Sequence, residues 1–200
     1  AAEFNSQRQR SATLVQGDLL GEDVIPNLVA QAAAFNQRLD ALINNASSFY
    51  ATKMGHVEVE QWEDLVGTNM KAPFFLAQAA APWLKKSNGS IVNMVDVHGF
   101  RPKKDFAVYS MAKAAIAMMV NVLSRELGPD VRVNVVAPGI ILWPEHGLAE
   151  EEKVRMLSRT ALQRPGNPDD IASTVRFLVT EAHALTGQIS AVDGGRMTQQ

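Results

Sequence analysis

The chain has 200 residues, 46% of them hydrophobic, which is enough to bury one good core and typical of a single domain. Its 19 Lys and Arg residues are balanced by 21 Asp and Glu residues, and the formal net charge of -2 marks no surface for nucleic acid or an anionic membrane. Cysteine is absent and the four histidines are scattered, so we expect no disulfide and no metal site. The apolar stretches look far short of a membrane span. We therefore expect one cytoplasmic domain over residues 1–200 that acts on a small molecule, with no nucleic-acid or membrane partner.

Short apolar or β-branched runs alternate with longer segments whose apolar residues recur at helical spacing. The expected strands lie at 12–18, 40–46, 89–95, 131–139 and 188–195. The expected helices cover 23–37, 58–85, 107–127, 149–159 and 168–180. This alternation predicts an α/β fold: a Rossmann-like, doubly wound, mainly parallel sheet with helices on both faces. Ligands bind beyond the carboxyl ends of such strands, so the residues after each run are candidates for function.

The run at 40–46 breaks abruptly into NNASSFY, residues 44–50. Small Ala46 and Ser47 would let a ligand approach the backbone, and the two asparagines can bond across neighbouring strand ends. Phe49 offers a flat face for stacking an aromatic ring. The alternative is a polar turn with one core aromatic.

The segment 58–85 carries an apolar stripe that we expect to face the core, formed by Trp62, Leu65, Val66, Met70 and Phe74. Pro73 stands four residues after Asn69, and because proline has no N–H, the carbonyl of Asn69 loses its normal helix partner. We predict a bend there, with a carbonyl that could hold a water in a cleft. A simple proline kink is the alternative.

Tyr109 and Lys113 lie four residues apart in the helical segment 107–127, hence on one face and within one turn. An ammonium near the phenol would stabilise phenolate and lower the pKa of Tyr109. The strand at 89–95 ends just before Asp96, and the following loop leads directly into the helix, so Asp96 and Tyr109 can converge on one cleft. Two partly exposed helix residues are the alternative.

Taken in order, NNAS at 44–47, Asn69, Tyr109-x-x-x-Lys113 and Pro138-Gly139 resemble the hallmarks of the short-chain dehydrogenase/reductase family, over essentially the whole chain. The resemblance implies that Tyr109 is the proton donor and that Lys113 lowers its pKa and binds the nicotinamide ribose. It implies that the Asn69 carbonyl holds a water of the proton relay. Further cofactor contacts are implied for Asp18, Asn45, Ala46, Gly139 and Ile140.

Asp96 departs from the family pattern, since most members carry serine at that position, thirteen residues before the tyrosine. A carboxylate cannot donate a hydrogen bond to a substrate carbonyl unless it is protonated. Together with NNASSFY, Asp96 is similar to the pteridine reductase branch. That branch implies NADPH-dependent hydride transfer to a ring C=N of a dihydropterin or dihydrofolate. Phe49 would then stack on the pterin, and Ser47 would contact cofactor phosphate and substrate.

Two other interpretations stay open: a reductase of another carbonyl, such as a 3-ketoacyl thioester, or a catalytically inert dinucleotide-fold scaffold. Trp143 stands where many relatives carry a threonine that helps to hold the cofactor. We expect it to form a lid over the substrate with Pro144, Glu145 and His146. A loop tryptophan that packs on its neighbours is an equal alternative.

No glycine-rich phosphate-binding turn precedes Asp18, so we expect that the N-terminal βαβ portion, about 30 residues or more, is missing here. The choice of NADPH over NADH rests on the branch alone. Because tetramers are usual in the family, we expect a homotetramer whose interface lies on the helices at 58–85 and 107–127.

Overall fold

The computed structural model describes residues 1–21, 23–144 and 147–198. Within them, four strands form one sheet in the order β1 (Ala41–Asn44), β2 (Ser90–Met94), β3 (Arg132–Pro138) and β4 (Ile189–Val192). Every neighbouring pair is parallel, with Asn44 opposite Asn93, Met94 opposite Val136 and Pro138 opposite Val192. The carboxyl ends of all four strands therefore meet at one edge.

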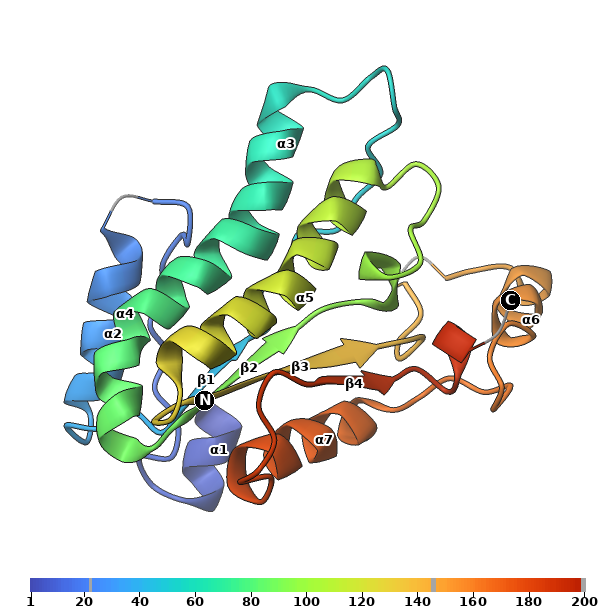
Figure 1. The fold of residues 1–200 in the computed structure, drawn as a ribbon. Coiled ribbons are helices and arrows are strands. Elements are labelled where there is room, and N and C mark those ends of the chain that lie inside the picture. The colour runs from blue at the N-terminus through green and yellow to red at the C-terminus, as the bar shows by residue number, and fades with distance from the viewer. Residues whose placement is uncertain (22, 145–146, 199–200) are drawn as a thin grey trace.

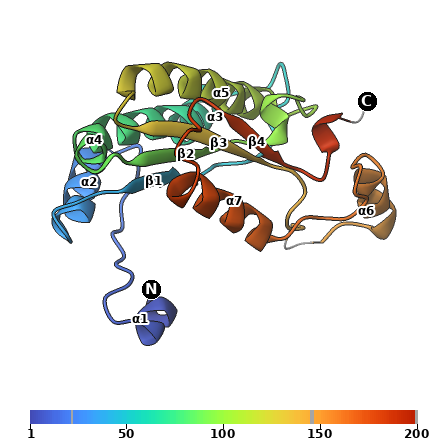
Figure 2. The same ribbon diagram turned by 60° about the horizontal axis from the view of Figure 1, so that its bottom comes forward.

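Helices cover both faces of this sheet (Figures 1 and 2). Residues on one side of the strands, such as Ile91 and Val133, pack against α2 (Val24–Ala34), α4 (Ala72–Ser87) and α5 (Ala107–Leu127). Residues on the other side, such as Val92 and Val136, pack against α7 (Pro168–Thr180). Alternate residues of a strand point to opposite faces, which is why a strand buried on both sides is apolar throughout. The predicted Rossmann-like α/β fold is confirmed.

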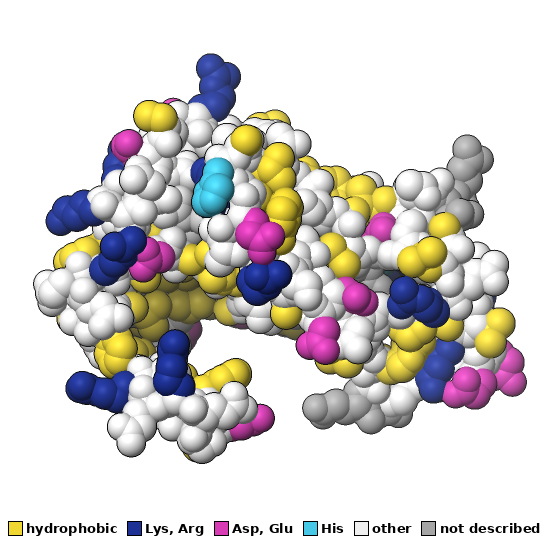
Figure 3. All heavy atoms as spheres, turned by 90° about the horizontal axis from the view of Figure 1, so that it is seen from below, with side chains coloured by type: hydrophobic (Ala, Val, Ile, Leu, Met, Phe, Trp, Pro, Cys, Tyr) yellow, Lys and Arg dark blue, Asp and Glu magenta, His cyan; other side chains and the backbone are white. Residues whose placement is uncertain are grey.

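The strand expected at 12–18 does not form, and this prediction is wrong. Residues 8–21, which follow α1 (Ala2–Gln7), form no helix or strand, and Leu14 is 82% exposed. A strand needs a neighbour whose backbone groups complete its ladder, and none of the described strands runs beside this segment. Figure 2 shows α1 standing away from the body, and Figure 3 shows hydrophobic side chains along the gap between them.

The helix expected at 58–85 is divided into α3 (Val59–Val66), a π-helical turn η1 (Gly67–Lys71) and α4. The Ala72 N–H bonds to the Gly67 carbonyl, five residues back, and Pro73, which has no N–H, follows at once. The helix is therefore irregular just before Pro73, as a π turn, and the bend and the water on the Asn69 carbonyl stay predictions.

The expected core stripe of this segment is largely wrong. Leu65 is fully buried, but Trp62 is 46% exposed, and Met70 and Phe74 are each 38% exposed. The buried face runs instead through Asn69 and Pro73, each one residue before an expected position of the stripe.

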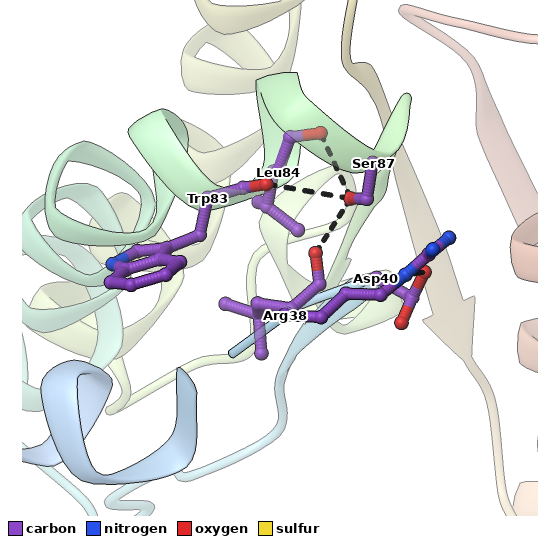
Figure 4. Close-up of polar contacts among 6 residues, drawn as sticks. Arg38, Asp40, Trp83, Leu84 and Ser87 are labelled. Carbon is purple, nitrogen blue, oxygen red and sulfur yellow. Dashed lines mark hydrogen bonds and ion pairs between the residues drawn. The ribbon is translucent and has the colours of Figure 1, made fainter. Parts of the chain in front are cut away.

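The C-terminal end of α4 is tied to the start of β1 (Figure 4). The Ser87 hydroxyl lies 2.6 Å from the Leu39 carbonyl oxygen and also approaches the carbonyls of Trp83 and Leu84. The left-handed Asn88 ends the helix, and Gly89 follows where a Cβ would lie 2.8 Å from the Asp40 carbonyl oxygen. The chain can therefore turn directly from α4 into β2, beside β1.

Helix α5 is long and apolar enough to cross a membrane by length and composition, the single such helix among the described residues. The expectation that every apolar stretch is too short is wrong for this helix. It lies on the sheet, and its buried face includes Ile116 and Val120 together with the polar Tyr109 and Lys113. This is the pattern of a core helix, one face of which also carries the predicted catalytic pair.

Two shorter elements complete the C-terminal half, α6 (Glu150–Leu157) and the 3-10 turn η3 (Arg196–Thr198). Helix α7 ends against Arg132, at the start of β3. One guanidinium nitrogen, Nη1, donates to the carbonyls of Leu178 (2.6 Å) and Ala182 (2.9 Å), and the other, Nη2, to that of Val179 (2.9 Å). Carbonyls at the C-terminal end of a helix have no hydrogen-bond partners within the helix. A cation placed there binds them and also interacts favourably with the helix dipole.

We expect Arg132→Gln to lower the free energy of unfolding by roughly 1–3 kcal/mol, because it removes charge-assisted hydrogen bonds from a helix end. Urea denaturation measures the change. The matched control is Arg176→Gln. Arg176 lies on α7, and its ion pair with Glu181 joins side chains that are 69% and 52% exposed. The control should change stability by less than about 1 kcal/mol. Equal losses in the two variants would contradict the role of Arg132.

Candidate active site

The loop after β1 is anchored by a pair of asparagines at the sheet edge. Asn44 and Asn93 are opposite one another in the ladder, and the Asn44 amide donates to Asn93 Oδ1 at 2.7 Å. Both side chains are buried. The predicted bond across neighbouring strand ends is confirmed for Asn44, and it fixes where the NNASSFY loop begins.

Asn69, in the π turn, holds the next part of this loop through its side chain. Its Oδ1 accepts from the Ser47 hydroxyl at 2.7 Å, and its Nδ2 donates to the carbonyls of Ser48 (2.9 Å) and Leu65 (3.0 Å). Asn69 is only 1% exposed; its bond to Leu65 is buried, and its bonds to Ser47 and Ser48 are partly buried. The prediction concerned the backbone carbonyl of Asn69, whereas in the structure its side chain joins the helix to the loop.

Asp96 and Tyr109 converge as predicted. The Tyr109 hydroxyl donates to Asp96 Oδ2 at 2.9 Å, while Asp96 Oδ1 accepts from the backbone N–H of His98 at 2.8 Å. Lys113 lies one turn further along α5, where its ammonium donates to the Met94 carbonyl at 3.2 Å and lies 5.7 Å from the centre of the Tyr109 ring. The end of β2 and the first turns of α5 thus build one polar cluster.

Burial of Tyr109, with the charge and the hydrogen bond of Asp96, raises the pKa of its phenol; the nearby Ser47 hydroxyl acts in the opposite direction. The net shift is opposite to the one predicted from Lys113, because burial and the directly bonded carboxylate of Asp96 both favour the neutral phenol, while the ammonium bonds a carbonyl. Burial lowers the pKa of Lys113 to about 8, against the charge of Asp96, which raises it. Tyr109 therefore keeps its proton at neutral pH.

The rings of Phe49, Phe106 and Tyr109 pack together, and we call this cluster the aromatic wall. The Phe49 ring stacks on Phe106 with centres 4.7 Å apart and meets the Tyr109 ring edge to face at 4.8 Å. The ammonium of Lys103 lies 4.1 Å from the centre of the Phe106 ring. Phe49 remains 50% exposed, so part of its surface is open for a ligand.

Sequence reasoning missed Phe106 and Lys103. Phe106 stands three residues before Tyr109, a spacing that could have pointed to the same helix face. Lys103 belongs to a charge run that the sequence presents as solvated, and nothing in the sequence places it over a phenylalanine.

Arg196, in η3, is a further residue that sequence reasoning missed. Its guanidinium donates to the Met156 carbonyl at 3.1 Å. Burial, followed by the charge of Arg159, lowers the pKa of Arg196, while the charge of Asp96 raises it. Arg196 thus adds positive charge on the Asp96 side of the site.

A hollow of about 170 Å³ lies beyond the carboxyl end of β1 and is lined in part by Asn45, Ala46 and Leu19. Asn44 also lines it, and Asn44 Oδ1 has no hydrogen-bond partner among the described residues, which suits a polar ligand. Asp18 does not line this hollow, although its neighbour Leu19 does. The Asp18 carboxylate instead accepts from the N–H of Leu20 at 2.9 Å. Asn45 and Ala46 are therefore brought together at one hollow, with Asp18 beside it.

Gly139 and Ile140 lie at the same sheet edge, beyond β3. The Gly139 N–H bonds to the Val192 carbonyl at 3.0 Å, and a Cβ at this position would lie 2.6 Å from the Asp193 Cα, so only glycine fits. The Ile140 carbonyl accepts from the Gly166 N–H at 2.8 Å. Their contact with a cofactor stays a prediction.

Trp143 lies in the loop between β3 and α6, with its ring centre 5.8 Å from the ammonium of Lys153 on α6. Glu145 and His146, the other expected lid residues, lie outside the described residues. A larger hollow of about 580 Å³ lies below the loop around Arg164, beside the end of β4, and none of the predicted site residues lines it. The lid therefore stays a prediction.

Comparison with known proteins agrees with this geometry. A family model described as Enoyl-(Acyl carrier protein) reductase matches residues 1–197. The 3-oxoacyl-(acyl-carrier-protein) reductase FabG of Thermotoga maritima is 34% identical over 177 residues, which cover 86% of this chain and 72% of that protein. The "Probable galactose dehydrogenase GalD" of Rhizobium meliloti is 31% identical over 200 residues, covering 95% of this chain and 77% of that one.

The "Crystal structure of a putative short-chain alcohol dehydrogenase from Sinorhizobium meliloti 1021" superposes with a TM-score of 0.92 at 28% identity, covering 100% of this chain and 81% of that one. The chain belongs to the short-chain dehydrogenase/reductase family. It is an NAD(P)H-dependent oxidoreductase.

The chain has two tyrosines, so in Tyr50→Phe the phenol of Tyr109 can be titrated alone. Adding Asp96→Asn removes the negative charge that raises the pKa of Tyr109. We expect tyrosinate absorbance to appear at lower pH in the double variant than in Tyr50→Phe, with circular dichroism reporting whether the fold persists. Coincident titrations in two folded proteins would show that Asp96 does not control the phenol.

Proposed function

We propose that the protein reduces a dihydropterin or dihydrofolate at a ring C=N with NADPH. The observation that carries this proposal is the carboxylate of Asp96 bonded to the hydroxyl of Tyr109, next to the exposed ring of Phe49.

Asp96 selects for a substrate that donates hydrogen bonds. An ionised carboxylate only accepts them, and it repels the carbonyl oxygen of a ketone. A pterin presents an amino group and ring N–H groups along one edge, which can donate to Asp96. The protonated Tyr109 can then deliver its proton toward a ring nitrogen.

Phe49 suits a flat heterocycle for a separate reason. Its half-exposed ring offers a stacking surface within 4.8 Å of the Tyr109 ring centre. Phe106 and the loop bonds behind Phe49 keep this surface in place. Ring stacking and edge recognition would therefore act on the same ligand.

The residues present fit a dinucleotide on the other side of the site. Asn45 and Ala46 would hold the adenosine side at the hollow beyond β1, and Lys113 would bind the nicotinamide ribose. When bound, NADPH supplies the hydride. Lys113 keeps positive charge next to Tyr109 and so would favour the phenolate left after proton donation.

A 3-oxoacyl thioester is the second candidate substrate, and the names of several relatives favour it. Asp96 argues against it, because this position should donate a hydrogen bond to the ketone. An inert scaffold fits poorly, since Asn69, Tyr109 and Lys113 are assembled around one site.

We also propose a cytoplasmic homotetramer. Its support is the apolar side chains left exposed on η1, α4 and α5, including Met70, Phe74, Met118 and Val122. Exposed apolar side chains on neighbouring helices are typical of a subunit interface.

The first test measures NADPH oxidation by the full-length protein with dihydrobiopterin, dihydrofolate and a 3-oxoacyl thioester. We expect turnover of a pterin and little turnover of the thioester. Asp96→Ser should abolish pterin reduction and, if the position works as in relatives, improve the thioester reaction. Full pterin activity in Asp96→Ser, or turnover of the thioester alone by the wild type, would refute the proposal.

Phe49→Ala should raise the KM for the pterin about three- to tenfold, the range expected for loss of an aromatic stack, with the KM for NADPH unchanged. Phe177→Ala is the matched control, because Phe177 is a similarly exposed phenylalanine on α7. Equal rises in both KM values would argue that Phe49 supports the fold of the site instead of stacking on the substrate.

A further inference from the structure

The outer end of the aromatic wall carries a positive charge. The Lys103 ammonium lies 4.1 Å from the centre of the Phe106 ring and 5.2 Å from that of Phe49. Phe49 is the ring on which the proposed substrate stacks, so this inference rests on the proposed function.

The loop that carries Lys103 is fixed to the Phe49 loop. The Thr52 N–H bonds to the Asp105 carbonyl at 2.6 Å, Thr52 pairs with Phe106 in an isolated bridge, and the Val108 N–H bonds to Thr52 Oγ1 at 3.3 Å. These bonds hold the backbone just after Lys103 against the loop that carries Phe49.

The exposure of the side chains increases along the aromatic wall, from Tyr109 at its buried end to Lys103 at its outer end. Tyr109 is 3% exposed, Phe49 is 50% exposed, and Lys103 is an exposed residue of the rim. A pterin held by Asp96 and Tyr109 at the buried end must send its substituent outward. That substituent would then pass along Phe49 toward the ammonium of Lys103.

Lys103 takes no part in the ion pairs formed between described residues, which join Arg38 to Asp40, Lys153 to Glu150, Arg155 to Glu152 and Arg176 to Glu181. A ring face holds a cation but leaves most of its charge uncompensated. Since the aromatic rings already restrict the side chain, less conformational entropy is lost when an anion binds it.

We propose that Lys103 determines substrate specificity by binding a carboxylate on the substituent of the pterin. The preferred substrates would then be of the dihydrofolate class, which end in glutamate carboxylates, over dihydrobiopterin, whose side chain is neutral.

The test compares kcat and KM for dihydrofolate and dihydrobiopterin in the full-length wild type, Lys103→Gln, Lys103→Arg and the neighbouring control Lys104→Gln. Lys103→Gln should raise the KM for dihydrofolate about three- to fivefold, the upper range for an exposed ion pair, with kcat unchanged. The KM for dihydrobiopterin and for NADPH should stay the same. Lys103→Arg should retain wild-type values, and Lys104→Gln should behave as wild type.

Ionic strength separates charge from packing. Added salt should raise the KM of the wild type for dihydrofolate and have less effect on Lys103→Gln, because salt screens an exposed ion pair. Equal KM changes for both pterins, or a Lys104→Gln variant as impaired as Lys103→Gln, would overturn the role of Lys103 while leaving pterin reduction intact. Absence of turnover with either pterin in the wild type would overturn both proposals.

Discussion

The parallel pairing of four strands in register is the constraint on which the site depends. Each parallel strand must return to the same end of the sheet before it can pair, so the segments after β1, β2 and β3 all leave from one edge. Asn45, Asp96 and Gly139 are far apart in the sequence, yet each is the first or second residue beyond its strand. The hydrophobic layers on both faces hold this register, since a shift of one residue would turn apolar side chains away from α5 or α7.

Polar side chains then fix the loops at that edge. The Asn44–Asn93 bond joins two strand ends, and the Asn69 side chain connects the π turn to the loop at Ser47 and Ser48. The Asn44–Asn93 bond is buried and the other two are partly buried, and a polar group left without its partner in such places is costly. The loop that carries Phe49 is therefore held from both the sheet and the helix, which gives an otherwise exposed aromatic ring a defined position.

The electrostatics of the cluster distinguish this site from one built around a serine. Burial and the Asp96 carboxylate both favour the neutral phenol of Tyr109, while burial favours the neutral amine of Lys113. The charge on each of the three groups affects the protonation of the others, because they share a site with little water. A substrate that donates hydrogen bonds to Asp96 would offset part of its negative charge, and that change would itself make Tyr109 a stronger acid.

The sequence by itself determined the alternation of strands and helices, the family, and the identity of Asn69, Asp96, Tyr109 and Lys113, because local periodicity and short motifs carry that information. It predicted the limits of α5 and α7 and the meeting of Asp96 with Tyr109. Only the tertiary structure decided that residues 12–18 form no strand, since pairing depends on a neighbour and not on propensity. It also decided the π turn, the exposure of Met70 and Phe74, the direction of the Tyr109 pKa shift, and the position of Lys103 over Phe106. Each of these depends on distances between segments that are remote in the chain, and such distances exist only once the chain has packed.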